Sequence, residues 1–115
     1  MTNDIKNMRE YRQKMNNIIL STNDKNIKRF FALDNKVYNP GALDKKTKEL
    51  MGLVASTVLR CNACIFYHVD QCKKAGVTDA ELHEAVSIAL IIGGSITIPH
   101  IRFLFEMWEK LKKEK

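Results

Sequence analysis

The chain has 115 residues, 45% of them hydrophobic and 28% charged, and a formal net charge of +6. This length fits one domain over residues 1–115, and the composition is typical of a folded globular protein rather than a disordered one. Much of the positive charge lies in the C-terminal run 110–115, without an arginine-rich stripe or an alternation of aromatic and basic residues. No nucleic-acid partner is therefore expected.

The sequence also argues against export and against a membrane anchor. Residues 1–6 lack the apolar core followed by small residues that marks a secretory signal. The longest uncharged stretch, residues 85–99, is shorter than the roughly 20 apolar residues that cross a bilayer, and Gly93 and Gly94 interrupt it. We expect a cytoplasmic protein, in which a close cysteine pair serves redox chemistry or metal binding rather than a structural disulfide.

The N-terminal third of the chain predicts two helices. Apolar residues in the range 5–19 form one face of a first helix, and those in the range 27–37 repeat the three-four spacing in a second. The turn residues 39–41 (Asn-Pro-Gly) close this pair. These first 40 residues carry no motif that indicates a function.

The rest of the chain predicts four more helices. Asp44 is placed to cap a third helix, whose apolar stripe covers residues 50–58. A fourth helix ends at Gly76, and a capping box over residues 78–81 opens a fifth. Pro99 suits the first turn of a sixth. No period-two pattern competes, so we expect an all-α fold, a single-domain bundle of about six helices.

The end of the predicted fifth helix is apolar on every side. Residues 88–92 contain no polar side chain, and the apolar character continues with short interruptions to Ile98. Such a segment should be buried from all sides, yet one chain of this size can hardly enclose it. We therefore expect a homo-oligomer with this segment near the subunit interface.

The run Cys61-Asn62-Ala63-Cys64 is the strongest chemical signal in the sequence. Two cysteines at i and i+3 put their sulfurs on one side of a helical turn, close enough for a disulfide. With Asn62 as N-cap, Cys64 would lie in the first turn, where N–H groups and the helix dipole favour a thiolate. His68, four residues later, would be stacked above Cys64 and could carry its proton.

Two other interpretations of this segment stay open. Free cysteines are often buried, so the pair could belong to a core. Zinc is the other alternative. The four candidate ligands between Cys61 and Cys72 span roughly 16 Å of helix and cannot surround one ion. A metal would therefore need a ligand from elsewhere, such as His100. We interpret Cys72 as a core residue without a chemical role.

Several features follow one another in a fixed order: the run 43–50, the cysteine pair with His68, the segment 76–78 with Glu81, and the glycines 93–94. Together they resemble the carboxymuconolactone decarboxylase-like superfamily, and within it the alkyl hydroperoxidase D-like branch, over about residues 41–111. The resemblance implies an all-α fold and assembly as a homotrimer or homohexamer. Decarboxylases of the superfamily lack the cysteine pair, so its presence argues against lactone decarboxylation.

The resemblance also implies roles for four residues. Cys64 matches the thiol that attacks a peroxide, buried behind its partner, and Cys61 matches the more exposed thiol that resolves it and exchanges with an external reductant. His68 matches the histidine of a proton relay, and Glu49 matches the glutamate that works through a water beside the thiols. The branch carries a further histidine between its cysteines, where this chain has Ala63, so part of the relay is missing.

The local pattern leaves the environment of Glu49 open. Its place at the edge of an apolar stripe lets it point into a partly buried cleft, whereas the neighbouring Lys45 and Lys48 suit a solvated position. His83 is expected on a solvated face. His100, at a helix start, is expected to stay away from the thiols.

These observations favour a thiol-dependent peroxidase-like oxidoreductase. Its catalytic residues would be Cys64, Cys61, His68 and Glu49, and it would need no organic cofactor and no metal. Its partners would be a peroxide or disulfide substrate and a dithiol reductant protein. Three alternatives stay open: a disulfide oxidoreductase or redox sensor with little peroxide turnover, a non-enzymatic oligomeric or zinc-binding module, and a carboxymuconolactone decarboxylase-type lyase.

Overall fold

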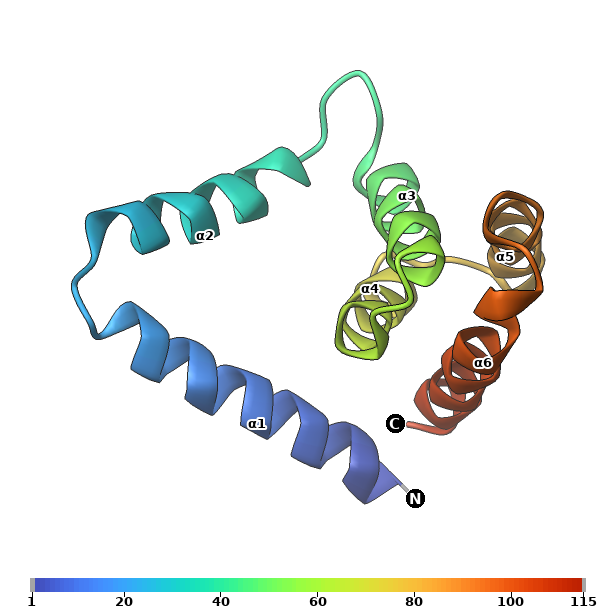
Figure 1. Ribbon diagram of the computed structural model, residues 1–115, viewed down its shortest axis with the longest axis horizontal. Helices are drawn as coiled ribbons and strands as arrows, with labels where there is room; N and C mark the ends of the chain where they lie inside the picture. Colours follow the sequence, from blue (N-terminus) through green and yellow to red (C-terminus); the bar gives the residue numbers. More distant parts are fainter. Residues whose placement is uncertain (1, 115) are drawn as a thin grey trace. The chain divides into compact units, whose positions relative to one another are not determined.

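The computed structural model describes residues 2–114, which are helical apart from short connections and form no strand. The elements, drawn in Figure 1, are α1 (Thr2–Leu20), α2 (Lys25–Val37), α3 (Lys45–Val58), α4 (Asn62–Lys74), α5 (Asp79–Gly93), a 3-10 turn η1 (Ser95–Thr97) and α6 (Ile98–Lys113). For the described residues, the expectation of an all-α fold with about six helices is confirmed. None of these helices has the length and apolar character that crossing a membrane requires.

The chain divides into two compact units, Met1–Asn39 and Pro40–Lys115. The first contains α1 and α2. α2 begins after Asp24, whose carboxylate accepts hydrogen bonds from the backbone N–H groups of Asn26 and Ile27 at 2.9 and 3.0 Å, and no side chain of α2 is buried. That both units form one domain over residues 1–115 stays a prediction.

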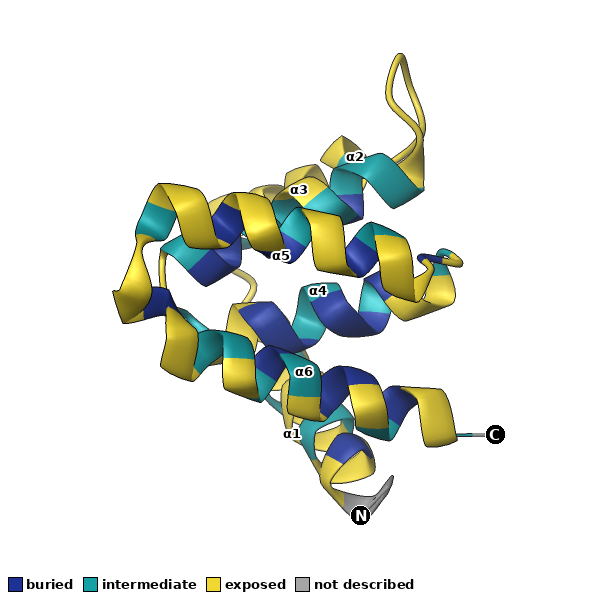
Figure 2. Ribbon diagram, turned by 90° about the vertical axis from the view of Figure 1, so that its right-hand side faces the viewer, coloured by how far each residue is buried: buried dark blue, intermediate teal, exposed yellow. Residues whose placement is uncertain are grey.

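The second unit packs four helices around a core. α3 contacts α5 and α4, and α4 contacts α6, and the rings of His83 on α5 and Phe105 on α6 also meet. In Figure 1, α3 and α4 lie on one side of this unit and α5 and α6 on the other. Figure 2 shows their buried positions on the sides that face one another. Burial of each aliphatic core side chain contributes about 1.5–3 kcal/mol. The core side chains that are less than 2% exposed include Leu53, Ile65, Val69, Leu82, Leu104 and Trp108.

Local hydrogen bonds start α3 and α5 where the sequence predicts. Asp44 accepts the N–H of Thr47 at 2.7 Å, and its hydrogen bonds with Thr47 hold the pKa of its carboxyl below the usual value. Thr78 and Glu81 form the expected capping box through bonds of 3.2 and 2.9 Å. Glu81 also pairs with Lys46 Nζ of α3 at 3.0 Å, which ties the two helix starts together.

Particular residues end α4 and α5, start α6 and join α6 to α5. Gly76 after α4 and Gly94 after α5 have φ values of 85° and 79°, which side chains disfavour and glycine adopts freely. Pro99 lies in the first turn of α6, as expected, and the 3-10 turn before it was not anticipated. Trp108 of α6 donates its Nε1–H to Oδ1 of Asp79 at 2.7 Å, so α6 is bound back to the start of α5.

The apolar end of α5 is not enclosed by its own chain. Ile88, Ile91 and Ile92 are 50%, 81% and 64% exposed, whereas Ala89 is buried. The single chain therefore does not enclose residues 88–92, as expected for a chain of this size, and their burial on all sides in an oligomer stays a prediction. The physical reason is that the helices packed against α5 cover only one of its sides.

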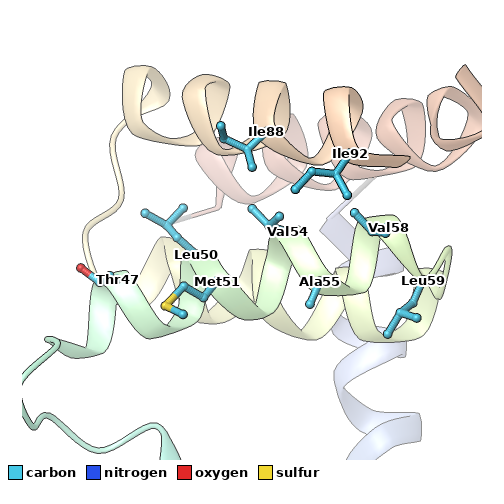
Figure 3. Close-up of a pocket in the computed structure, with 9 residues that line it drawn as sticks. All are labelled: Thr47, Leu50, Met51, Val54, Ala55, Val58, Leu59, Ile88 and Ile92. Atoms are coloured by element: carbon cyan, nitrogen blue, oxygen red, sulfur yellow. The ribbon is translucent and has the colours of Figure 1, made fainter. Parts of the chain in front are cut away.

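α3 and α5 also border an apolar groove of about 550 Å³ (Figure 3). Leu50, Val54 and Val58 line it from α3, and Ile88 and Ile92 line it from α5. With 3.6 residues in each turn, these α3 positions lie on the side of the helix opposite Glu49. The groove and Glu49 therefore lie on different faces of α3.

Candidate functional site

Cys61 connects α3 to α4. After α3, the N–H of Arg60 bonds to the carbonyl of Thr57 at 3.0 Å, and the N–H of Cys61 bonds to the carbonyl of Ser56 at 3.1 Å. This pair of bonds is a Schellman motif, and Arg60, with φ of 61°, stands where glycine is usual. The next helix begins at Asn62, so Cys61 closes one helix motif and opens another.

The N-cap of α4 lies one residue before the expected position. Cys61, not Asn62, is the cap: its backbone is extended, and its Sγ accepts the N–H of Cys64 at 3.3 Å. The reason is that the Schellman turn leaves Cys61 as the extended residue directly before the helix. Both sulfurs lie at the N-terminal end of α4, where free N–H groups and the helix dipole stabilise a thiolate.

The two cysteines are exposed in the opposite order to the one expected. Cys64 is exposed and Cys61 is intermediate, and neither forms a disulfide with a described residue. α4 turns the next two side chains, Ile65 and Phe66, into the core, which leaves Cys64 at the outer edge of the first turn. The expectation that Cys64 is buried behind Cys61 is therefore wrong for this chain.

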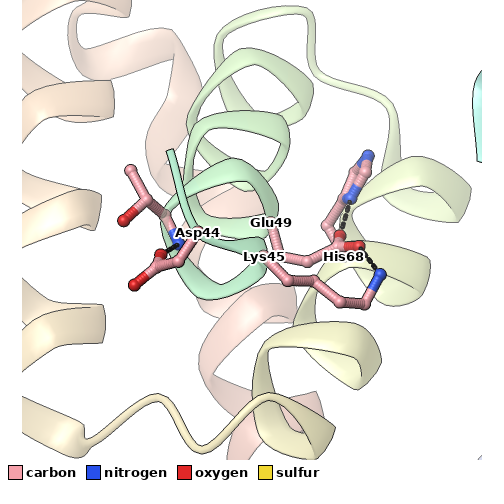
Figure 4. Close-up of polar contacts among 5 residues, drawn as sticks. Asp44, Lys45, Glu49 and His68 are labelled. Carbon is pink, nitrogen blue, oxygen red and sulfur yellow. Dashed lines mark hydrogen bonds and ion pairs between the residues drawn. The ribbon is translucent and has the colours of Figure 1, made fainter. Parts of the chain in front are cut away.

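Glu49 of α3 and His68 of α4 form the central contact of the site. His68 Nδ1 lies 2.9 Å from Glu49 Oε1, and Lys45 Nζ lies 3.3 Å from Glu49 Oε2 (Figure 4). The Glu49 side chain is completely buried and that of His68 is 12% exposed. Of the two environments that the sequence left open for Glu49, the structure has the buried one. A buried carboxylate needs such donors, because an unpaired one would be strongly destabilising.

This contact also orients the imidazole. A carboxylate only accepts hydrogen bonds, so Nδ1–H of His68 is the donor. In neutral His68 the lone pair is then on Nε2, the ring nitrogen directed away from Glu49. His68 follows Cys64 by one helical turn, on the same side of α4. The arrangement is suited to moving a proton at the start of α4.

Gly52 makes room for the His68 ring, a role that was not predicted from the sequence. A Cβ atom at Gly52 would lie 2.6, 2.8 and 2.9 Å from three atoms of that ring. Tyr67 meets the same ring edge-on, with centroids 5.1 Å apart. A glycine inside a helical pattern costs about 1 kcal/mol relative to alanine, and that cost was the available signal for a packing role.

Cys72 lies two turns beyond Cys64 and is fully buried. Burial, and then the charge of Glu49, raise the pKa of the Cys72 thiol to about 12. It therefore stays protonated and unreactive near neutral pH, in keeping with the core position expected for it. In the described part of the chain, no three His, Cys, Asp or Glu side chains are grouped as a metal site would need.

The two remaining histidines differ in environment. His83 on α5 is exposed, as expected, and its ring stacks at 5.6 Å on that of Phe105. His100, which was expected to lie away from the thiols, has its Nδ1 2.7 Å from Oδ1 of Asn62, the residue after Cys61. The sequence gave no indication of this contact, because it joins residues 38 positions apart.

Comparison with known proteins identifies relatives of this fold and site. The model of the carboxymuconolactone decarboxylase family matches residues 25–106. Two crystal structures of a Thermotoga maritima protein are similar to the chain. One is 54% identical with a TM-score of 0.92, covering 94% of this chain and 95% of that one. The other is 52% identical with a TM-score of 0.89, covering 93% and 91%. It is described as a carboxymuconolactone decarboxylase family protein for which involvement in an antioxidative response has been suggested.

More distant relatives match a shorter part of the chain. Alkyl hydroperoxide reductase AhpD of Mycobacteroides abscessus is 37% identical over 60 residues, which are 52% of this chain and 34% of that protein. AhpD of a Bradyrhizobium species is 41% identical over 58 residues, 50% of this chain and 32% of that protein. The chain thus spans about a third of the length of these two relatives. Because the family model covers well over half of the residues, this chain belongs to the carboxymuconolactone decarboxylase family and is an AhpD-like member of it.

Proposed function

We propose that this protein is a thiol-dependent peroxidase-like oxidoreductase that works through the Cys61–Cys64 dithiol. The observation that carries the proposal is the buried hydrogen bond of 2.9 Å between Glu49 and His68, one turn from Cys64. An ordinary core does not need a buried carboxylate paired with an imidazole beside two free thiols. The AhpD relatives and the antioxidative response suggested for the Thermotoga maritima protein support the same chemistry.

The proposed reaction uses two thiols and one peroxide. The thiolate of Cys64 attacks one oxygen of the O–O bond, which breaks and releases an alcohol, or water from hydrogen peroxide, and leaves a sulfenic acid on Cys64. The thiol of Cys61 then attacks this sulfur, forms the disulfide and releases water. An external dithiol restores both thiols by exchange and becomes a disulfide itself. No organic cofactor or metal takes part.

His68 carries the proton in this scheme. It accepts the proton of the Cys64 thiol and delivers it to the oxygen that leaves when the O–O bond breaks. Glu49 orients the ring through Nδ1 and stabilises the imidazolium that forms in between. Ala63, between the cysteines, provides no side chain for proton transfer. His68, one turn beyond Cys64, therefore performs this step without a second histidine from α4.

The exposure of the cysteines changes how the site meets its partners. Cys64 is the more exposed thiol, so a peroxide reaches it directly. In the Cys61–Cys64 disulfide, Sγ of Cys64 is also the more accessible sulfur for attack by a reducing dithiol. The resemblance had implied that Cys61 exchanges with the reductant. Regeneration by a dithiol needs a reducing compartment, which agrees with the expected cytoplasmic location.

We also propose that the protein works as a homotrimer or homohexamer. The exposed isoleucines of α5, Ile88, Ile91 and Ile92, form an apolar surface next to the groove on α3. A contiguous surface of this kind is unusual on a monomer and typical of a subunit interface. The interface and the Glu49 side of α3 would then be separate.

The first prediction divides the roles of the cysteines. Cys64→Ser abolishes the reaction with peroxide, because the attacking sulfur is gone. Cys61→Ser still reacts once and stops at a sulfenic acid on Cys64, which dimedone labels and mass spectrometry locates. Cys72→Ala, which changes a buried and protonated thiol, keeps the reaction. A label on Cys61 in the Cys64→Ser protein would mean that the roles are exchanged. If the wild-type protein forms its internal disulfide by exchange with an added disulfide but not with peroxide, the result would favour the alternative function, a disulfide oxidoreductase.

The second prediction concerns Gly52. Gly52→Ala should leave the helix intact, because alanine is the better helix former by about 1 kcal/mol. Its methyl group displaces the His68 ring, and misplacement of about 1 Å slows peroxide-driven thiol loss by roughly a hundredfold. Gly41→Ala is the control, since its nearest neighbour would be Lys48 Nζ at an ordinary 3.7 Å. Equal rates in Gly52→Ala and wild type would remove His68 from the mechanism.

The third prediction tests the assembly. Sedimentation equilibrium at micromolar concentration should give the mass of a trimer or a hexamer. Ile91→Lys, which places a charge at the most exposed isoleucine of the apolar surface, should reduce that mass, whereas Glu106→Lys at an exposed position of α6 should not. A monomeric wild-type protein would contradict the proposal.

A further inference from the structure

His100 reaches the turn that carries both cysteines. It lies in the first turn of α6, and its Nδ1 is 2.7 Å from Oδ1 of Asn62. Asn62 is the first residue of α4 and lies between Cys61 and Cys64. An amide oxygen can only accept a hydrogen bond, so the imidazole Nδ1–H is the donor. The contact thus connects α6 to the dithiol turn.

We propose that His100 is a positioning residue for the dithiol. Its hydrogen bond to Asn62 anchors the first turn of α4 to α6 and keeps Cys61 and Cys64 placed for disulfide formation. This inference rests on the proposed function in one respect, namely that the cysteine pair cycles between thiols and disulfide.

The first turn of α4 needs such an anchor, because burial does not hold it. Asn62, Ala63 and Cys64 are all exposed, and the buried face of α4 begins at Ile65. The bonds from the N–H of Ile65 to the carbonyl of Cys61, at 2.8 Å, and from the N–H of Cys64 to Sγ of Cys61, at 3.3 Å, stay within this turn. Helix ends that lack tertiary contacts open readily. The His100 bond supplies a tertiary contact at this end.

Anchoring this turn favours the internal disulfide. Closing the disulfide removes conformational freedom from the segment between the two sulfurs. Where the segment is already held in place, less freedom remains to be lost, and the effective concentration of one thiol near the other is higher. Loss of the anchor should therefore shift the equilibrium toward the dithiol while the rest of the helix stays formed.

The test is the equilibrium of the full chain with reduced and oxidised glutathione. The fraction of Cys61–Cys64 disulfide is measured by alkylation and mass spectrometry, which also separates Cys72. His100→Ala and Asn62→Ala should each lower the equilibrium constant by about fivefold, as expected for one hydrogen bond. The double variant should be no lower than either single variant, because both remove the same interaction.

Two conservative variants separate positioning from a general structural effect. His100→Asn puts an amide N–H at the place of Nδ1, and it should restore the wild-type equilibrium constant to within about twofold. His100→Gln puts its amide at the place of Nε2 and should behave like His100→Ala. His83→Ala, at an exposed histidine of α5, should leave the constant unchanged. Circular dichroism verifies that each variant keeps its helices.

The outcomes distinguish this inference from the proposed function. If the wild type forms no internal disulfide at any glutathione ratio, the proposed function fails. If it forms the disulfide but His100→Ala does not change the constant, the function stands and the role of His100 is wrong. The same conclusion follows if the Asn and Gln variants at position 100 behave alike.

Discussion

The site depends on one constraint: the carboxylate of Glu49 is fully buried and must be given hydrogen-bond donors. Lys45, one turn earlier on α3, supplies the first, and His68 on α4 supplies the second. Because the second donor comes from another helix, pairing the carboxylate also fixes how α3 and α4 face each other. Gly52 lets the imidazole lie against α3. The same packing places His68 one turn from the exposed Cys64, so the contact that holds α3 against α4 is also the one on which the proposed chemistry depends.

Local features of the sequence predicted the helices well. Asp44, Thr78 and Gly76 act through residues within five positions, and the structure has each of them at the expected helix end. The cap of α4 was misplaced for an equally local reason. Where α4 starts depends on how α3 ends: the Schellman turn at Arg60 makes Cys61 the cap.

The parts that the sequence did not predict depend on distant contacts. Glu49 is buried because it pairs with His68 of α4, which comes 19 positions later in the sequence. The contact of His100 with Asn62 and the fit of the His68 ring against Gly52 arise only when helices pack. The end of α5, by contrast, is exposed on the single chain, in keeping with the prediction that another subunit covers it. Of the residues that the family resemblance implied, the structure joins Glu49 and His68. The order of exposure that the resemblance implied for the two cysteines is wrong.

The central claim is that His68 moves the proton of Cys64 while Glu49 holds its ring. The rate of peroxide-driven thiol loss in His68→Asn, compared with wild type, tests this most directly. The asparagine amide replaces Nδ1–H and keeps a donor for Glu49, whereas the Nε2 lone pair is lost. We expect a folded protein whose second-order rate with hydrogen peroxide is lower by about a hundredfold. An unchanged rate in His68→Asn, or a wild-type rate no higher than that of free cysteine, would contradict the account.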